Sequence, residues 1–275
     1  MLKLKKMSVV DKKFNFLKPI KTSNLIRLGR DHDGGYIVDR EILKDCENLI
    51  SFGVGEDWSF ELDFIKEKKN IKIHIYDYSV SIYPYLKELL KYLRRFLTFR
   101  TSLNDVIIRF KKLKDYIRLI NNKNITFFKE KISFPSKKNF ESDVDKVFSR
   151  ISQEKQVFLK CDIEGSEYEI IDQILKYYDR IEMLIFEFHN IDKNEIIFLH
   201  SVKKIQNYFH IIHIHGNNHD GKLSTGLPIT IEMTLINKKK LKRHVKEFVT
   251  NFPVEGLDKS NNPNKDDLKF SFSTD

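Results

Sequence analysis

The chain has 275 residues, 41% of them hydrophobic and 32% charged, with a net charge of +10, which suits a globular protein with a sizeable core. No apolar run is long enough to span a bilayer, the basic N-terminal stretch has no signal-peptide core, and two cysteines exclude a disulfide scaffold. We therefore expect a cytoplasmic protein. The charge suggests an anionic partner, namely a phosphorylated or nucleotide-linked small molecule, nucleic acid or an anionic membrane surface, although abundant lysine as a compositional habit would also produce it.

Residues 25–38 predict a strand, a turn with two adjacent glycines, and a second short strand. The turn contains Gly34 and is followed by Tyr36. An ordinary hairpin is the favoured interpretation. A glycine pair also lets the backbone approach a ligand closely, so this turn remains a candidate binding element.

Residues 49–52 predict a strand that ends in Gly53-Val54-Gly55, and residues 58–68 have helical periodicity. A strand that turns through glycines into a helix is typical of the nucleotide-binding opening of a Rossmann-like unit. The third glycine of the dinucleotide fingerprint is missing, and Glu56 and Asp57 would repel a pyrophosphate. The turn therefore argues against NAD and favours a ligand that presents an amine or hydroxyls.

The next strand, residues 71–76, ends in Asp77. A carboxylate at the end of the second strand, some 20 residues after the glycine turn, is placed to bind ribose hydroxyls. A lone aspartate more often caps a helix. Together with the glycine turn, the ribose role is the favoured hypothesis.

A basic, helix-patterned insertion follows, from Ser79 to Asn124. Its apolar spacing predicts two helices that are broken near Thr101 and Ser102, with lysines and arginines on the outward faces. Three roles are open: a cap over the active site, a basic element at a membrane surface, or plain helical packing. We favour the cap.

An acidic turn follows the short buried strand that begins at Val157. It carries Asp162 and Glu164, and the helix after it begins near Glu167 and Tyr168. Ligands of open α/β sheets bind at the carboxyl ends of strands. A helix dipole favours acids in the first turn, which explains Glu167 structurally. Capping explains Asp162 and Glu164 less well, so these are the functional candidates.

The strand at residues 181–188 contains Glu187 near its end and leads into His189. A helix over 191–209 and strands over 211–215 and 229–236 complete the pattern, and the tail beyond Asn251 lacks periodicity. We expect a single domain over 1–275, with a core at about 25–250, a helical insertion at about 80–122 and an irregular tail at about 251–275.

These motifs resemble class I S-adenosylmethionine-dependent methyltransferases, and the FkbM-type group most closely. The resemblance rests on the run from Phe52 to Asp57, on Asp77, and on the Lys-x-Asp-hydrophobic-Glu-Gly-x-Glu run from Lys160 to Glu167. It implies an α/β, Rossmann-like class I methyltransferase fold with a mostly parallel central sheet flanked by helices. The insertion after the second strand and the Tyr78-Ser79 pair depart from the group's pattern and leave the substrate open.

The resemblance implies an O-methyltransferase in carbohydrate or polysaccharide biosynthesis that acts on a hydroxyl of a sugar, a nucleotide-activated sugar or a related metabolite. S-adenosylmethionine would be the cofactor, because a sulfonium cation is favoured beside carboxylates that would repel a pyrophosphate. The cofactor-binding candidates are Gly34, Tyr36, Gly53, Gly55, Glu56, Asp57, Asp77 and Asp162.

The catalytic candidates are Asp162, Glu164, Glu187 and His189. His189, with an ordinary pKa of about 6.5, suits a general base near neutrality. The same residues could hold a divalent metal, or His189 could be a structural buried imidazole. An RNA methyltransferase and a non-catalytic Rossmann-like binding protein are the alternatives to the small-molecule enzyme, and peripheral membrane contact stays open.

Overall fold

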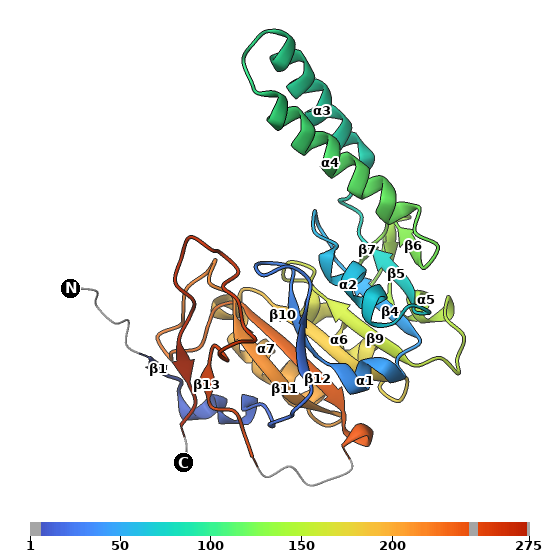
Figure 1. Cartoon of the computed structure of the whole chain (residues 1–275). Helices are drawn as coiled ribbons and strands as arrows, with labels where there is room; N and C mark the ends of the chain where they lie inside the picture. Colours follow the sequence, from blue (N-terminus) through green and yellow to red (C-terminus); the bar gives the residue numbers. More distant parts are fainter. Residues whose placement is uncertain (1–6, 242–246, 274–275) are drawn as a thin grey trace, which may run out of the picture.

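The computed structural model describes residues 7–241 and 247–273, so the expected domain limits at Met1 and Asp275 lie outside the described residues. Its centre is a seven-stranded sheet of order β11-β12-β10-β9-β4-β5-β6 (Figure 1). The strands are β4 (Asn48–Phe52), β5 (Lys72–Tyr76), β6 (Ile125–Phe128), β9 (Val157–Cys161), β10 (Ile181–Phe188), β11 (Phe209–Gly216) and β12 (Ile231–Asn237).

The pairing of these strands defines the fold class. β4 lies at the middle and pairs in parallel with β5 and β9, while β12 pairs antiparallel with β10 and β11. Numbered along the chain, the order is 3-2-1-4-5-7-6 with the seventh strand reversed. This is the Rossmann-like class I methyltransferase fold, and the expected fold class is confirmed.

Helices cover both faces of the sheet. Within one strand, Val157 and Leu159 belong to one hydrophobic core and Phe158 to the other, because successive side chains of a strand point to opposite faces. The first core contains side chains of α5 (Val144–Ser149), α6 (Glu167–Leu175) and α7 (Ile191–Ile205). The second contains side chains of α1 (Arg40–Asp45) and α2 (Ser59–Glu67).

The expected strand-turn-strand near the N-terminus is confirmed. β2 (Leu25–Leu28) and β3 (Tyr36–Asp39) pair antiparallel, with Leu28 opposite Tyr36. Tyr36 and Val38 pack in the core that α2 also enters. The hairpin therefore lies beside the sheet and carries its glycine turn toward the end of β4.

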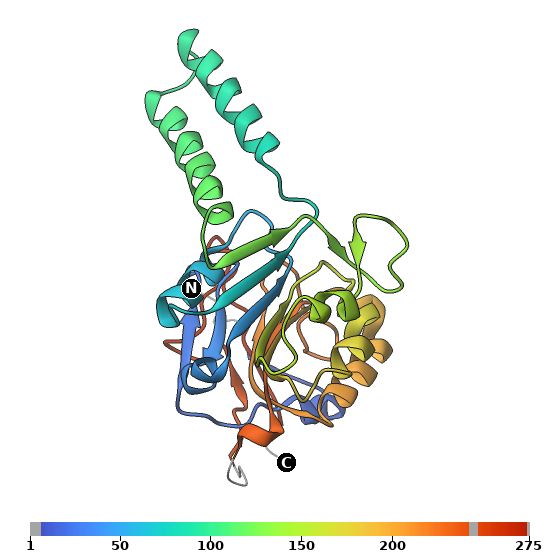
Figure 2. The ribbon, with the colours of Figure 1, turned by 90° about the vertical axis from the view of Figure 1, so that its right-hand side faces the viewer.

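The insertion between β5 and β6 forms the two expected helices, α3 (Ile82–Leu97) and α4 (Leu103–Ile120). The break falls at Ser102, whose side chain forms a capping box with Asp105. The α3–α4 hairpin projects away from the body in both views (Figures 1 and 2). The inner faces of the two helices pack against each other, and Lys112 of α4 pairs with Glu56 of the glycine loop, so the favoured interpretation as a cap stays a prediction.

The segments near the two chain ends lie together. β1 (Ser8–Val9) pairs with β14 (Phe270–Ser271), which pairs with β13 (Asn251–Phe252). The segment expected as an irregular tail buries Phe252, Phe270 and Phe272 in the core. Non-periodic aromatic residues gave no helix or strand signal, and only their long-range burial orders them. The remaining short elements are η1 (Lys12–Leu17), β7 (Lys131–Ile132), β8 (Glu141–Ser142) and η2 (Lys238–Lys240).

None of the helices in the described part of the chain combines the length and apolar character that a bilayer crossing needs.

Candidate active site

The glycine loop after β4 lies against the turn after β9. Gly53 has a φ of +72°, and a Cβ at this position would lie 1.8 Å from the carbonyl oxygen of Asp162. The two strand ends can approach this closely only because the position carries no side chain. Glycine at residue 53 therefore joins the two motifs that the sequence singled out.

Asp77 anchors the glycine loop from the end of β5. Its Oδ2 accepts hydrogen bonds from the backbone N–H groups of Val54 and Gly55, both at 3.0 Å. Its Oδ1 accepts from the backbone N–H of Ser79 at 2.8 Å and from the hydroxyl of Ser79 at 2.6 Å. Burial acts to raise the pKa of Asp77, but these hydrogen bonds outweigh it and lower the pKa. The loop is thus held by an ionised carboxylate, and its contact with ribose stays a prediction.

A cavity of about 710 Å³ opens at the carboxyl ends of β4, β5 and β9. This is the edge where α/β sheets bind their ligands. Every cofactor-binding candidate and one further catalytic candidate line it: Gly34, Tyr36, Gly53, Gly55, Glu56, Asp57, Asp77, Asp162 and Glu164. The structure therefore brings these positions, spread over 131 residues of chain, to one wall.

Two of the candidates are held by ion pairs. Arg30 Nε lies 2.7 Å from Asp57 Oδ2, and Lys112 Nζ of α4 lies 3.7 Å from Glu56 Oε2. Asp57 Oδ1 also accepts a hydrogen bond from the backbone N–H of Ser59 at the start of α2. Arg30, which the sequence did not mark, also lines the cavity.

Tyr36 links two catalytic candidates. Its hydroxyl lies 2.9 Å from Asp162 Oδ2 and 3.1 Å from Glu187 Oε2. Burial, and then the charges of these two carboxylates, raise the pKa of Tyr36 well above its ordinary value, so the hydroxyl keeps its proton. Glu187 is buried and accepts a further hydrogen bond from Asn217 Nδ2 at 2.9 Å. Tyr36, which lines the cavity, therefore bridges Asp162 and the buried Glu187.

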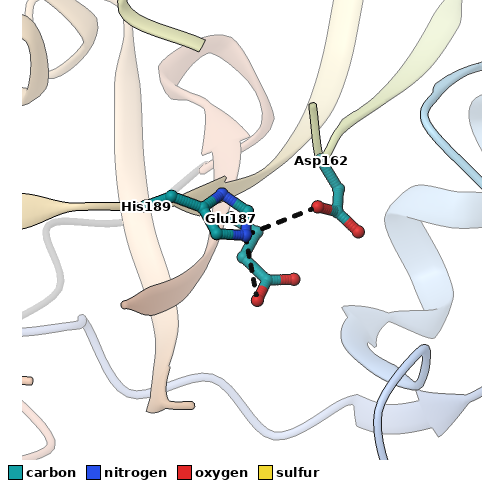
Figure 3. Close-up of side chains that lie close together, drawn as sticks. All are labelled: Asp162, Glu187 and His189. Atoms are coloured by element: carbon teal, nitrogen blue, oxygen red, sulfur yellow. Dashed lines mark ion pairs between the residues drawn. The ribbon is translucent and has the colours of Figure 1, made fainter. Parts of the chain in front are cut away.

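His189 faces three of the carboxylates. Its Nε2 lies 3.8 Å from Asp162 Oδ1 and 3.7 Å from both Glu164 Oε2 and Glu187 Oε1. Figure 3 shows the imidazole pointing at Asp162 and Glu187. Burial acts to lower the pKa of His189, but Glu167, Glu187 and Asp162 raise it to about 10. The expectation of an ordinary pKa is therefore wrong, and the ring is a cation at neutral pH.

Glu167 orients this histidine. The Glu167 side chain is fully buried, and its Oε1 accepts hydrogen bonds from the backbone N–H groups of Ile163 and Gly165, both at 3.1 Å. The same oxygen lies 2.9 Å from His189 Nδ1. The purely structural interpretation of Glu167 is thus incomplete: it holds the acidic turn and fixes the ring of His189.

Glu164 occupies a backbone conformation that side chains rarely adopt. Its φ is +57°, and its side chain is 88% exposed at the mouth of the site. A non-glycine residue in the left-handed region costs of order 1–3 kcal/mol and is common at ligand sites. This conformation aims the carboxylate toward His189 and the cavity instead of along the following helix.

Lys160 is a site residue to which the sequence assigned no role. Its side chain is 4% exposed, and Nζ donates to the carbonyl of Gly53 at 2.7 Å and lies 3.8 Å from Asp162 Oδ2. Burial acts to lower the pKa of Lys160, but Asp162, Glu61 and Glu187 outweigh it and raise the pKa. A lysine inside an otherwise apolar strand was the signal that could have identified it, because a buried charge requires a partner.

The donor set of the site could hold a metal ion. One ligand atom each from Asp162, Glu187 and His189 lie within 4.8 Å of one another, as do those of Asp33, Glu187 and Glu232. His189 would have to lose its proton to ligate a cation. The metal hypothesis therefore competes with the protonated state of His189.

No family model and no curated protein matches the sequence. Among solved structures, the chain is similar to fibrillarin in a fibrillarin/Nop5p complex (13% identity, 72% of this chain and 79% of that chain, TM-score 0.39). It is also similar to a precorrin-6y C5,15-methyltransferase from Geobacter metallireducens (12% identity, 72% of this chain and 86% of that chain, TM-score 0.37). A third similar structure is that of a putative rRNA-methylase from Clostridium thermocellum (11% identity, 72% of this chain and 91% of that chain, TM-score 0.38). At these levels the likenesses carry no argument about activity, and the fold assignment rests on the strand order.

Proposed function

We propose that this protein is an S-adenosylmethionine-dependent O-methyltransferase that acts on a hydroxyl of a small anionic acceptor, such as a sugar or a nucleotide-activated sugar. The observation that carries the proposal is the concentration of carboxylates around the cavity. Glu56, Asp57, Asp77, Asp162 and Glu164 all line it. A site with this charge disfavours a pyrophosphate and favours a cationic ligand.

The residues present fit the cofactor. Asp77 would accept from the ribose hydroxyls, the loop from Gly53 to Gly55 would pass beneath the adenosyl group, and Asp162 would face the sulfonium. The bound cofactor would supply an activated methyl group on a positively charged sulfur. Glu56 and Asp57 are ion-paired to Lys112 and Arg30, so the remaining negative charge of the lining comes from acids such as Asp77 and Glu164, with Asp162 beside Lys160.

Asp162 is our proposed general base. Methyl transfer to a hydroxyl forms an oxygen–carbon bond, breaks the sulfur–carbon bond and releases the hydroxyl proton, which a carboxylate can accept. Burial raises the pKa of Asp162, despite the opposing charges of Lys160 and His189. The protonated His189 cannot accept this proton. Its role would be to hold Asp162 and Glu187 in position, with Glu164 closing the outer side.

Cofactor binding is the first test. Titration calorimetry of the whole chain with S-adenosylmethionine and with its demethylated product should give saturable binding, and Asp77→Asn should weaken it by about tenfold or more. The control is Asp172→Asn, an exposed acid on α6 that pairs with Lys204. An absence of heat and of thermal stabilisation at millimolar cofactor would refute the proposal.

Acceptor identity is the second test. An assay for release of the demethylated cofactor over a panel of sugars, nucleotide-activated sugars and phosphorylated metabolites should find turnover. Cofactor binding without turnover on any acceptor would favour a non-catalytic binding protein. Phosphorylated and nucleotide-linked members of the panel are expected to react faster than neutral sugars, because Lys131 lines the same cavity.

An RNA methyltransferase is the second candidate, and the basic α3–α4 hairpin is the observation that favours it. Such an enzyme would bind RNA with an affinity that falls steeply with salt. Methyl transfer to RNA, with no activity on the small-molecule panel, would replace the first proposal.

A further inference from the structure

The α3–α4 hairpin presents an apolar face that no described part of the chain covers. The face consists of Leu86 and Leu93 on α3 and Phe110 and Ile117 on α4, all of which are exposed, and Leu90 and Ile107 add exposed apolar surface on the outer sides of the two helices. At the tip, Leu97 is 76% exposed and Phe99 is 98% exposed. Exposed apolar patches of this kind are typical of surfaces that meet a partner or a membrane.

The two rows of side chains lie on the same side of the hairpin. On α3, the exposed Leu86 and Leu93 directly follow Tyr85 and Tyr92, which contact α4 through Tyr116 and Arg109. On α4, Phe110 and Ile117 directly follow these same two residues, Arg109 and Tyr116. One residue turns about 100° around a helix. Because the helices are antiparallel, the same turn brings both rows to one face.

The packing of the hairpin holds this face rigid. The rings of Tyr85 and Tyr116 stack with their centroids 5.2 Å apart. The ring of Trp58, from the body, lies edge-on to both, with centroid distances of 6.3 Å to Tyr85 and 6.2 Å to Tyr116. Arg109 lies 4.1 Å from the ring centroid of Tyr92 and donates to its hydroxyl at 3.1 Å. The apolar side chains on the open side are therefore not left over from a loosely packed pair of helices.

Positive charge borders the apolar face. Residues 82–120 contain ten lysines and arginines against three acids. Five of the cations, together with Leu90, line a hollow near the tip: Lys87, Lys91, Arg94, Arg95 and Arg100. None of these five forms an ion pair with the described residues 7–241 and 247–273. Cations beside an exposed apolar row are the arrangement that binds anionic lipid surfaces.

Phe99 strengthens the assignment to a surface. Its φ is +54°, a conformation that a bulky side chain rarely adopts, and the strain is not repaid by burial within the chain. Phe99 lies in the connection between α3 and α4 and its side chain is exposed. Figure 2 shows this connection at the end of the hairpin that lies farthest from the body. A ring in this position can enter a flat surface before any other part of the molecule meets it.

We propose that the α3–α4 hairpin is a membrane-surface anchor, which inserts Leu97, Phe99 and the apolar face at the headgroup boundary of a bilayer rich in anionic lipid. A second copy of the chain is the weaker occupant, because it would bring another strongly cationic hairpin against the first. A nucleic acid would use the cations and leave the apolar face uncovered. The inference is independent of methyl transfer.

Co-sedimentation of the whole chain with vesicles tests the anchor without cofactor or acceptor. The chain should bind vesicles of phosphatidylcholine mixed with phosphatidylglycerol, and binding to phosphatidylcholine alone should be at least tenfold weaker. The double variant Leu97→Glu/Phe99→Glu should reduce partitioning to the mixed vesicles by at least tenfold. These positions are exposed at the tip, so the fold, checked by circular dichroism, should be unchanged.

The matched control carries the same two changes on α7, Ile196→Glu/Ile197→Glu, where the native side chains are 83% and 51% exposed. Its vesicle binding should equal that of the native chain. The triple variant Arg94→Gln/Arg95→Gln/Arg100→Gln should also lose at least tenfold, and its remaining binding should depend less on salt.

Three results would overturn the anchor. One is failure of the native chain to bind the mixed vesicles. Another is equal loss in the α7 control. The third is a dimer in light scattering that Leu97→Glu/Phe99→Glu dissociates while vesicle binding is unchanged. Salt-sensitive binding to a single-stranded RNA homopolymer without vesicle binding would assign the hairpin to nucleic acid instead.

Discussion

The acidic turn after β9 and the α3–α4 hairpin place charge in opposite ways. At the turn, Asp162 lies 3.8 Å from Lys160, and Glu167 lies 2.9 Å from His189. Most of the charged groups there are buried. On the hairpin, cations such as Lys87 and Arg94 lie in solvent beside apolar side chains that are also exposed. The turn has its partners within the chain, whereas the hairpin has a surface that requires a partner from outside.

The net charge of the whole chain combines these two regions of opposite charge. Most of the positive excess of the chain comes from the hairpin, while the cavity at the sheet edge is lined by acids. A single number for the whole chain therefore hides two sites with opposite preferences. A buried charged network responds strongly to the loss of one member, and an exposed charge responds weakly.

The largest expected effect is on turnover. Asp162→Asn should lower turnover about 1,000-fold, with a cofactor affinity within tenfold of the native value, because the amide cannot accept the hydroxyl proton. Asp172→Asn on α6, where the side chain is 72% exposed and pairs with Lys204, should leave turnover unchanged. Initial rates and calorimetry separate the two quantities, and native turnover in Asp162→Asn would remove Asp162 as the base.

The next effect is on stability at the junction of the two strand ends. Gly53→Ala should lower the free energy of unfolding by about 3 kcal/mol, because its Cβ would collide with the backbone of Asp162. Gly55→Ala is the matched control: its φ is also positive, but a Cβ there meets nothing within 4 Å, so about 1 kcal/mol is expected. Urea unfolding measures both, and equal losses would contradict the close approach.

His189 gives the turn a dependence on pH that the hairpin lacks. Its pKa is raised to about 10 in the folded chain, so its stabilising effect is fully present below about pH 6.5 and is lost as the pH rises through 10. The native chain should lose about 3 to 4 kcal/mol between pH 7 and 10. His189→Gln should flatten this slope, and urea unfolding at several pH values measures it.

A control for this slope is His210→Gln, since burial lowers the pKa of His210 and its charge makes no contribution above neutrality. The native slope should persist in that variant. A slope that His189→Gln leaves intact would mean that the carboxylates around the ring, and not the ring itself, carry the pH dependence.

The smallest effect is local to the hairpin. Arg109→Ala removes the contact with Tyr92 and should cost about 1 kcal/mol within the hairpin. Hydrogen exchange should quicken in α3 and α4 and stay unchanged in β9 and β10. Faster exchange throughout the sheet would show that hairpin and body unfold together.

Local pattern was enough to predict much of the fold. Short apolar runs predicted the buried strands, and helical periodicity predicted the two helices of the insertion. The turns at Gly53 and Asp162 marked strand ends. Each of these signals lies within a few residues of chain. These signals also placed the candidates at the carboxyl edge of a parallel sheet, where the cavity is found. The aromatic tail gave no such signal, because Phe252 and Phe270 are ordered only by residues far away in sequence.

The acidic stretch from Lys160 to Glu167 determined by itself that a carboxylate-rich turn follows a buried strand. The contacts and the protonation of each member depend on the tertiary structure. It placed Glu167 on His189, which makes the ring a cation, and Lys160 on Gly53, which ties the two turns together. It also made the α3–α4 hairpin project away from the body of the molecule. The physical reason is that protonation, strain and exposure depend on groups that meet across the sheet, and a linear pattern contains no such distances.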